Sequence, residues 1–447
     1  MVLVATSDGK TAIDQPTLDR MFVLHDRYLA GVEGGRRINL ALCDASHLNF
    51  DGMCLDDAEL RGTRLQHCSM VGTSLRRANL FGADLRHCEM RQCDLTQADL
   101  RGAIMRGSNL EYAVLENADA RSGHLVRKNA GGELEAVNQD SQSGLIEGNL
   151  TGANLTGAKF AHQSLYATDL TNAILRGAKL RGADLSCCTL RGVQFEGADL
   201  TSANLSNCVM HGAILRGANL ADVILDGADL NAAVFDKETF DHCSTQATQF
   251  PQKLEGLNRK LKDILKAHVK WIDTLGREGK QANFSGIDLS DLDLDELDLS
   301  AADFSRALMV GTNFRNCSLS MGQFNSANCM HANFSHSNLR GANFRRATLS
   351  KANFRYCVGE SMPIVGAHHD VRWATNFSNA ILDGSTFEHA RLKSADFSEA
   401  SLRFVDFRGA NLSKANFLDA DVTNADFREA DLTNADFRGA IGFQPPE

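Results

Sequence analysis

The sequence GNLTGANL, residues 148–155, is the clearest passage of a five-residue repeat that runs from residue 145 to residue 250. A large apolar residue returns at every fifth position, and we call it position i. Position i−2 is small, position i−1 is often Asp or Asn, and position i+2 is often glycine. The same pattern begins at Leu40 and returns after residue 280, so it dominates most of the 447 residues.

A period of five residues does not suit an α-helix. At about 100° per residue, successive i side chains would lie roughly 140° apart and form no single stripe. In an extended segment, positions i−2 and i lie on the same face. Glycine at i+2 suits the corner that must follow, because it accepts conformations closed to other residues. The repeat therefore predicts a solenoid in which each coil is supported by its neighbours.

This pattern closely resembles the pentapeptide-repeat family, whose motif A(D/N)LXX is matched by 153–155 and 183–185 among many others. The resemblance implies an all-β solenoid, a right-handed quadrilateral β-helix with four pentapeptides per turn and with i and i−2 pointing inward. Some members of the family resemble DNA in shape and charge and inhibit DNA gyrase. Others are effectors that act in a host cell, although no delivery signal is legible in this sequence.

Two segments with helical spacing precede the two sets of pentads. The stripe of Leu18, Met21, Phe22, His25 and Leu29 is repeated, at a constant offset, by Leu261, Ile264, Leu265, His268 and Ile272. The two histidines have equivalent places, which favours a role in capping the solenoids over a paired site. We expect an N-terminal tail at 1–14, loosely attached, and a capping helix with a first solenoid at 15–250. A second capping helix and solenoid follow at 251–447.

Position i of the second solenoid alternates between Phe and Leu, beginning with Phe284 and Leu289. With four pentads per turn, this alternation places the phenylalanines on two opposite walls. We interpret the arrangement as core packing and not as an aromatic binding site.

Two insertions interrupt the pentads. The first, 121–144, has two short apolar runs around a Gly-Gly pair, which predicts a hairpin. The second, 355–376, contains the most metal-like cluster, but adjacent histidines without a fixed third ligand are weak evidence for a metal site. We retain both insertions as candidate interaction loops, with the residues Val126, Arg127, Gly131, Gly132, His368, His369 and Asp370.

The cysteines follow the repeat and do not form ligand pairs. Nine of the twelve occupy position i−2, where Cys acts as a small hydrophobe: Cys43, Cys68, Cys88, Cys93, Cys188, Cys208, Cys243, Cys317 and Cys357. There is no CxxC pair, so we expect no metal and no cofactor. Many reduced thiols, the absence of a secretory signal and the lack of about 18 consecutive apolar residues predict a cytoplasmic protein without a transmembrane segment.

Charge bears on the choice of partner. The net charge of −10 argues against direct nucleic-acid binding. Four acidic residues share the i−1 phase and ring one coil, whereas DNA mimicry needs a stripe along the solenoid: Asp288, Asp293, Asp298 and Asp303. One outward column alternates in sign: Arg176, Glu196, Arg216 and Asp236.

No catalytic constellation or phosphate-binding loop is present, and a regular rod lacks the deep apolar pocket typical of enzymes. We therefore predict a non-enzymatic bacterial interaction scaffold that presents β-helix faces and insertion loops to a macromolecule, which we expect to be a protein. The first alternative is a DNA mimic that binds and inhibits or protects DNA gyrase or a topoisomerase, which the charge pattern does not favour. The second is an effector that acts in a host cell.

Overall fold

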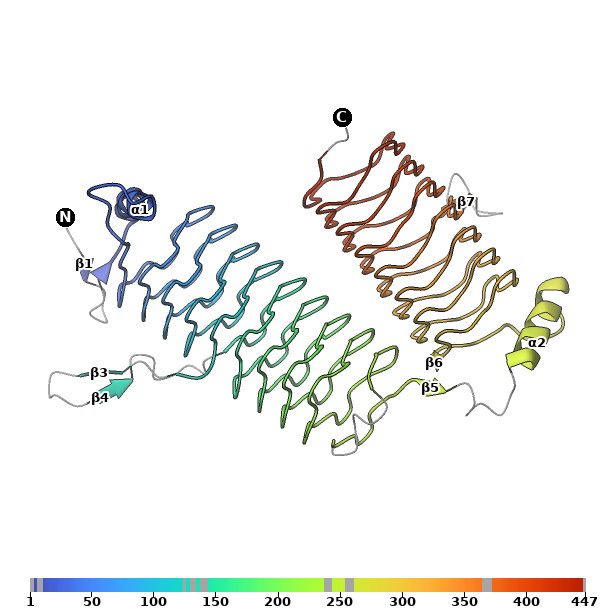
Figure 1. Ribbon diagram of the computed structural model, residues 1–447, viewed down its shortest axis with the longest axis horizontal. Coiled ribbons are helices and arrows are strands. Elements are labelled where there is room, and N and C mark those ends of the chain that lie inside the picture. Colours follow the sequence, from blue (N-terminus) through green and yellow to red (C-terminus); the bar gives the residue numbers. More distant parts are fainter. Residues whose placement is uncertain are drawn as a thin grey trace. The chain divides into compact units, whose positions relative to one another are not determined.

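The computed structural model describes residues 4–5, 11–123, 126–128, 134–136, 144–236, 243–253, 261–363 and 372–444. The chain forms two compact units, Met1–Asp229 with Phe235–Thr248 and Leu230–Val234 with Gln249–Glu447. Each unit contains a stack of coils (Figure 1). The expected boundary near residue 251 between two capped solenoids stays a prediction.

Each coil contains four pentads. Residue Asn149 forms a parallel bridge with Asp169, and every regular bridge joins residues twenty positions apart. The bridge at Asn149 is held by a hydrogen bond of 2.7 Å from the Leu150 amide to the Asp169 carbonyl. Backbone groups of each coil are thus paired with the coils before and after it, which is how a sheet satisfies its polar groups.

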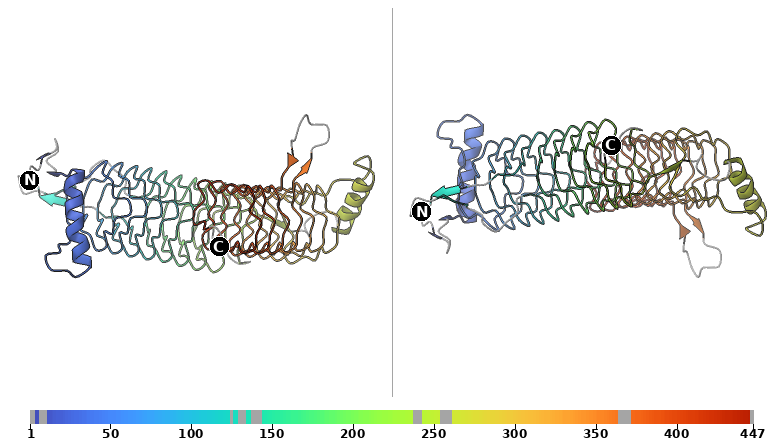
Figure 2. Two further views of the ribbon diagram at one scale, coloured as in Figure 1. Left: turned by 90° about the horizontal axis from the view of Figure 1, so that it is seen from above. Right: turned by 90° about the horizontal axis from the view of Figure 1, so that it is seen from below.

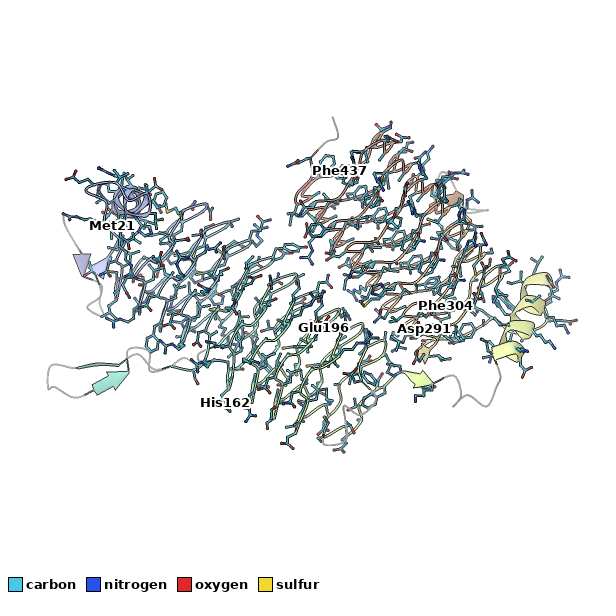
Figure 3. The ribbon with its side chains drawn as sticks, viewed as in Figure 1. Met21, His162, Glu196, Asp291, Phe304 and Phe437 are labelled. Atoms are coloured by element: carbon cyan, nitrogen blue, oxygen red, sulfur yellow. The ribbon has the colours of Figure 1, made fainter. Side chains whose placement is uncertain are left out.

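The corners are tight turns that use a positive φ angle at i+2. The Ala153 amide donates to the Leu150 carbonyl at 3.0 Å, and Gly152 between them has a φ of 64°. This combination is typical of a type II turn, which explains the frequent glycine. Other residues also adopt the conformation, as at the exposed His162, whose φ is 57° (Figure 3).

The core consists of the i and i−2 side chains, as predicted. Leu185 and Ala183 are 0% and 1% exposed. In the second unit, the phenylalanines form two columns, and Phe304 stacks on Phe324 with 4.8 Å between ring centroids. Rings of different columns meet edge to face, as at Phe314 and Phe324, whose planes differ by 88°. The alternation of Phe and Leu therefore fills the core, and the interpretation as packing is confirmed.

One helix lies at the end of each stack (Figures 1 and 2). Helix α1 spans Gln15–Leu29 and is capped by Asp14, whose side chain accepts from the Thr17 amide. Helix α2 spans Leu261–Asp273. Nδ1 of His25 accepts from the Ile38 amide at 3.1 Å, and Nδ1 of His268 accepts from the Ala282 amide at the same distance. The internal duplication seen in the sequence thus extends to the contact between helix and first coil.

The start of the chain differs from the expectation. Strand β1 (Val4–Ala5) pairs antiparallel with β2 (Thr11–Ala12), and Ala12 forms a parallel bridge with Asp44. The Asp44 amide donates to the Thr11 carbonyl at 2.8 Å. The expectation of a loosely attached segment is wrong for residues 11–14, because an exposed coil edge offers backbone partners whatever the side chains are. In the second unit, β5 (Gln252–Lys253) pairs in parallel with β6 (Ile287–Asp288).

Candidate functional site

The first insertion leaves the coil as a pair of antiparallel strands. Strand β3 (Val126–Lys128) pairs with β4 (Leu134–Ala136), with Arg127 opposite Glu135. The predicted hairpin is confirmed for these strands, and the candidates Val126 and Arg127 lie in β3. The candidates Gly131 and Gly132 lie outside the described residues.

The coil continues beneath this insertion. Ile104 forms its bridge with Gly144, so that two paired residues are separated by forty positions in place of twenty. The twenty additional residues are 124–143, which is narrower than the predicted 121–144. The Arg121 carbonyl accepts from the Gly102 amide and the Gly144 amide donates to the Ala103 carbonyl, so both ends of the predicted range still make regular contacts with the preceding coil.

The second insertion is built in the same way. Strand β7 (Met362–Pro363) pairs antiparallel with β8 (Arg372–Trp373), and both project from the side of the second stack (Figure 2). Asn343 forms its bridge with Asn376, so thirteen residues are additional. The Ser361 amide still donates to the next coil, to the Lys393 carbonyl. The insertion is therefore 362–374, narrower than 355–376, and His368, His369 and Asp370 lie outside the described residues.

A cavity of about 350 Å³ lies at the foot of β8. Its floor is a row of i−1 side chains from four successive coils of one wall: Gln323, Asn343, Asn376 and Asp396. Its sides include Met321, Arg372 and Trp373. The site therefore combines residues that are far apart in the sequence, and sequence analysis did not find it.

Polar contacts hold β8 over the coil. Nε of Arg372 donates to Oγ of Ser361 at 2.9 Å, and Nη2 donates to the Ser361 carbonyl at 2.7 Å. Trp373 stands beside Gly341 and is 46% exposed. The hydrogen bonds of Arg372 thus fix the backbone next to Trp373, while the indole ring itself is open to solvent.

The four acidic residues of one coil have a structural role. Each accepts a hydrogen bond from the amide two residues later, for example Asp288 from Ser290 at 3.0 Å and Asp303 from Ser305 at 2.9 Å. Asp293 and Asp298 make the equivalent contacts. An Asp or Asn side chain that bonds to its own backbone two residues on stabilises a turn, which accounts for these residues at i−1. They lie on successive walls of one coil, as the phase predicted.

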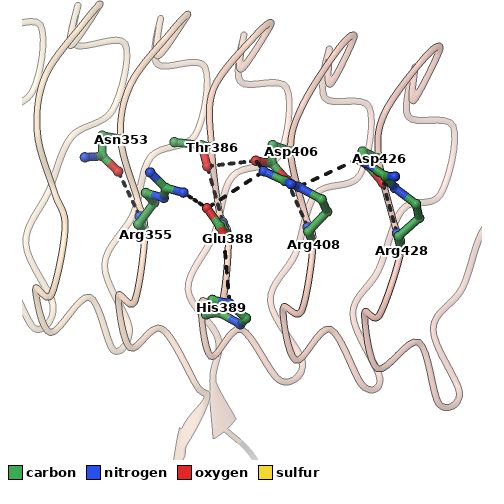
Figure 4. A network of polar contacts seen from close by, with 9 residues as sticks. All are labelled: Asn353, Arg355, Thr386, Glu388, His389, Asp406, Arg408, Asp426 and Arg428. Atoms are coloured by element: carbon green, nitrogen blue, oxygen red, sulfur yellow. Dashed lines mark hydrogen bonds and ion pairs between the residues drawn. The ribbon is translucent and has the colours of Figure 1, made fainter.

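Ion pairs alternate along one wall of the second unit (Figure 4). Arg408 lies 2.9 Å from Asp406 and 3.8 Å from Asp426, and Arg428 lies 2.6 Å from Asp426. Hydrogen bonds from these arginines lower the pKa values of Asp406 and Asp426. Glu388 contacts both Arg355 and Arg408. This wall is a mosaic of both charges and not a continuous negative stripe.

All twelve cysteines lie in the described residues, and none of them forms a disulfide bond. Cys93 is buried, and its thiol donates to the Met70 carbonyl of the preceding coil at 2.7 Å. Thr73 makes the same contact to Phe50, so Cys at i−2 replaces a hydroxyl donor as well as filling space. Burial raises the pKa of the Cys93 thiol to about 12, which disfavours thiolate chemistry. Cys43 and Cys243 are less buried than the prediction implied.

The described part of the chain contains no group of three His, Cys, Asp or Glu residues placed to hold a metal ion. Neither described helix is long and apolar enough to cross a membrane.

Comparison with models of known protein families tests the resemblance that the five-residue repeat suggested. A model described as pentapeptide repeats matches eight copies, over residues 58–97, 88–125, 149–186, 164–201 and 194–231. A second, described as a pentapeptide repeat region, matches 279–354 and 373–440. The chain belongs to the pentapeptide-repeat family. No curated protein matches this pentapeptide-repeat protein significantly.

Among solved structures, the chain is similar to QnrB1, a plasmid-mediated fluoroquinolone resistance protein, at 18% identity and a TM-score of 0.33, over 46% of this chain and 92% of that one. It is also similar to HetL, involved in heterocyst differentiation regulation in the cyanobacterium Nostoc sp. strain PCC 7120, at 20% identity and a TM-score of 0.15, over 96% and 98%. Rfr23 from the cyanobacterium Cyanothece 51142 shares 24% identity at a TM-score of 0.17, over 37% and 89%. Sequence identities and TM-scores this low carry no information about what this protein binds.

Proposed function

We propose that this pentapeptide-repeat protein is a non-enzymatic interaction scaffold whose insertions contact a protein partner. The observation that carries this proposal is the continuity of the coil beneath both insertions. Ile104 pairs with Gly144 and Asn343 pairs with Asn376 as if the intervening residues were absent. Segments that the coil does not need for its own pairing are available for binding, as surface loops on rigid scaffolds commonly are.

Mimicry of DNA at a gyrase or topoisomerase is the alternative that the family suggests. Two features of the second unit weigh against it. The four acidic residues are distributed around one coil and bind their own backbone. The wall of Arg408 and Asp426 carries alternating charges. A surface that replaces a nucleic acid needs a continuous negative potential, which neither feature supplies.

The proposal predicts that both insertions can be excised without loss of stability. Deleting 124–143 joins Gly123 to Gly144, and deleting 362–374 joins Ser361 to Thr375, which restores the regular offset of twenty residues. We expect the midpoint of urea unfolding, followed by circular dichroism, to change by no more than the equivalent of about 0.5 kcal/mol, because the residues that pair neighbouring coils are all kept. A large fall in the midpoint would contradict the continuity of the coil.

Affinity capture from the native lysate tests the function itself. The tagged full chain is compared with the doubly excised variant and with a control that lacks one complete coil, residues 161–180, and keeps both insertions. A partner that is lost with the insertions and retained by the control supports the scaffold. Gyrase or topoisomerase subunits retained by all three chains would contradict it and favour mimicry by the walls.

We also propose that α1 and α2 cap the solenoids through their buried histidines. His25 and His268 are both 0% exposed, and each Nδ1 accepts from an amide at the start of the coils. In the second unit, Leu261, Ile264 and Leu265 pack against the apolar core. A helix in this place covers backbone groups that would otherwise invite pairing with another chain.

This cap is expected to weaken in acid. Burial is the largest cause that lowers the pKa of both imidazoles below the ordinary 6.5. The unfolded chain therefore binds these protons more readily, so the stabilisation is present above about pH 6.5 and is lost progressively as the pH falls toward the folded-state pKa. We expect the urea midpoint to fall between about pH 7 and pH 5, and to fall less in the double variant His25→Gln/His268→Gln.

The control for this experiment is Phe404→Ala, which changes a side chain that is 65% exposed and carries no titratable group. Its pH dependence should match that of the unaltered chain. An identical fall in the double variant and in the unaltered chain would show that the two buried histidines are not responsible.

A further inference from the structure

The cavity beneath β8 is an open groove that follows the axis of the second unit. Its floor contains one side chain from each of four consecutive coils: Gln323, Asn343, Asn376 and Asp396. Coils in such a stack are separated by about 4.8 Å, the distance between neighbouring strands. The groove therefore repeats similar hydrogen-bonding groups at regular intervals, which suits an extended ligand better than a compact one.

Two polar atoms of this floor remain available for a ligand. Oδ1 of Asn376 accepts from the Ser378 amide, and Oδ1 of Asp396 accepts from the Ser398 amide and from Nδ2 of Asn416. Among the described residues, Nδ2 of Asn376 and Oδ2 of Asp396 have no hydrogen-bond partner. The floor thus offers a donor, Nδ2 of Asn376, beside an acceptor, Oδ2 of Asp396, and in each side chain Oδ1 is held in place by a hydrogen bond.

The side of the groove offers an aromatic face. Trp373 is 46% exposed and follows directly on Arg372, which is anchored to Ser361 by two hydrogen bonds. The described lining contains one cation, Arg372, and one anion, Asp396. Because their charges cancel, the groove does not select a strongly charged ligand such as a phosphate, which needs an excess of donors with positive charge.

We propose that this groove binds a neutral oligosaccharide. A sugar hydroxyl both donates and accepts hydrogen bonds, and amide and carboxylate side chains supply both partners. The apolar C–H face of a pyranose ring stacks on an indole, whose area dominates the contact in many sites. An extended glycan would lie along the wall and bring one ring to Trp373. This inference stands apart from the proposed protein partner, because it uses the floor of the coil and not the insertion alone.

Tryptophan fluorescence tests the proposal, because the chain has only two tryptophans, Trp271 and Trp373. In a Trp271→Phe background, the emission reports on Trp373 alone. The probes are cellohexaose, chitohexaose, laminarihexaose and maltohexaose, each titrated to about 10 mM, with sodium sulfate as an anionic comparison. We expect at least one hexaose to shift the emission with a Kd of about 1 mM or tighter, and sulfate to have no effect.

Variants connect the binding to the groove, with calorimetry as the readout where the fluorophore is removed. Trp373→Ala and Asn376→Ala should each weaken binding at least tenfold. The matched control is Phe404→Ala, which removes an aromatic side chain that is 65% exposed and lies outside the groove. Unchanged affinity in Trp373→Ala, or no binding of any of the four hexaoses, would overturn the proposal. Loss of a captured protein partner in Trp373→Ala without any sugar binding would instead assign the groove to protein contact.

Discussion

Replacing Leu185 by aspartate is expected to unfold the first unit. The side chain is 0% exposed, in a core that is only as wide as one coil. The Leu185 amide donates to the Asn204 carbonyl at 2.8 Å, so the substituted residue cannot leave the coil without breaking the pairing. An unpaired carboxylate in this place costs several kcal/mol, and we expect more than about 4 kcal/mol of stability to be lost. Circular dichroism during urea unfolding measures the loss.

The matched control is Arg181→Asp, which introduces the same carboxylate four residues earlier on an exposed side chain. Arg181 is 60% exposed at its side chain and lies 3.9 Å from Asp199. The variant loses this weak ion pair and gains a like-charge contact in water, which together cost about 0.5–1 kcal/mol. Equal unfolding midpoints for the two variants would overturn the assignment of positions i and i+1.

The second large effect is expected from Phe324→Ala. Phe324 stacks on Phe304 and Phe344, with centroid distances of 4.8 and 4.5 Å, and meets Phe314 and Phe334 edge to face. Removing the ring leaves a cavity in both directions along the column, and the hydrogen-bonded coils cannot close it. We expect the loss of about 3–5 kcal/mol in the second unit, measured by urea unfolding.

The same substitution at Phe404 provides the comparison, because this ring is 65% exposed. Its removal should change stability by no more than about 0.5 kcal/mol. If Phe324→Ala were as mild as Phe404→Ala, the two columns would not be a packed core, and the alternation of Phe and Leu would need another explanation.

The five-residue period predicted most of the fold because one rule determines each residue's environment. It predicted that Leu185 and Phe324 lie in the core. It also predicted that Cys93, at position i−2, is a small core residue and not a metal ligand. It also located both insertions. The predicted ranges were too wide, because Arg121 and Gly359 at their edges still make regular backbone contacts between coils. The amide of Gly359 still donates to the Arg391 carbonyl of the next coil, although a glycine at position i does not match the motif.

The candidate site was less accessible to sequence reasoning. Asn343 and Asn376 are neighbours on one wall, but an insertion of thirteen residues shifts the phase between them. Trp373 reaches the groove only because β8 returns beside the coil. The hydrogen bonds that explain Asp288 and Asp303 could have been anticipated, since Asp and Asn at i−1 precede a turn amide in every pentad. The sequence therefore contained this information, but these acidic residues were considered only as a possible negatively charged surface.

Hydrogen exchange of the captured complex tests most directly whether the insertions or the walls make the functional contact. Mass spectrometry compares backbone exchange in the free chain and in the chain bound to its captured partner. We predict new protection within 124–143 or 362–374 and unchanged exchange along the walls. Protection that recurs every twenty residues along one wall, with none in the insertions, would contradict the scaffold and show that the surface of the coil itself is the binding site.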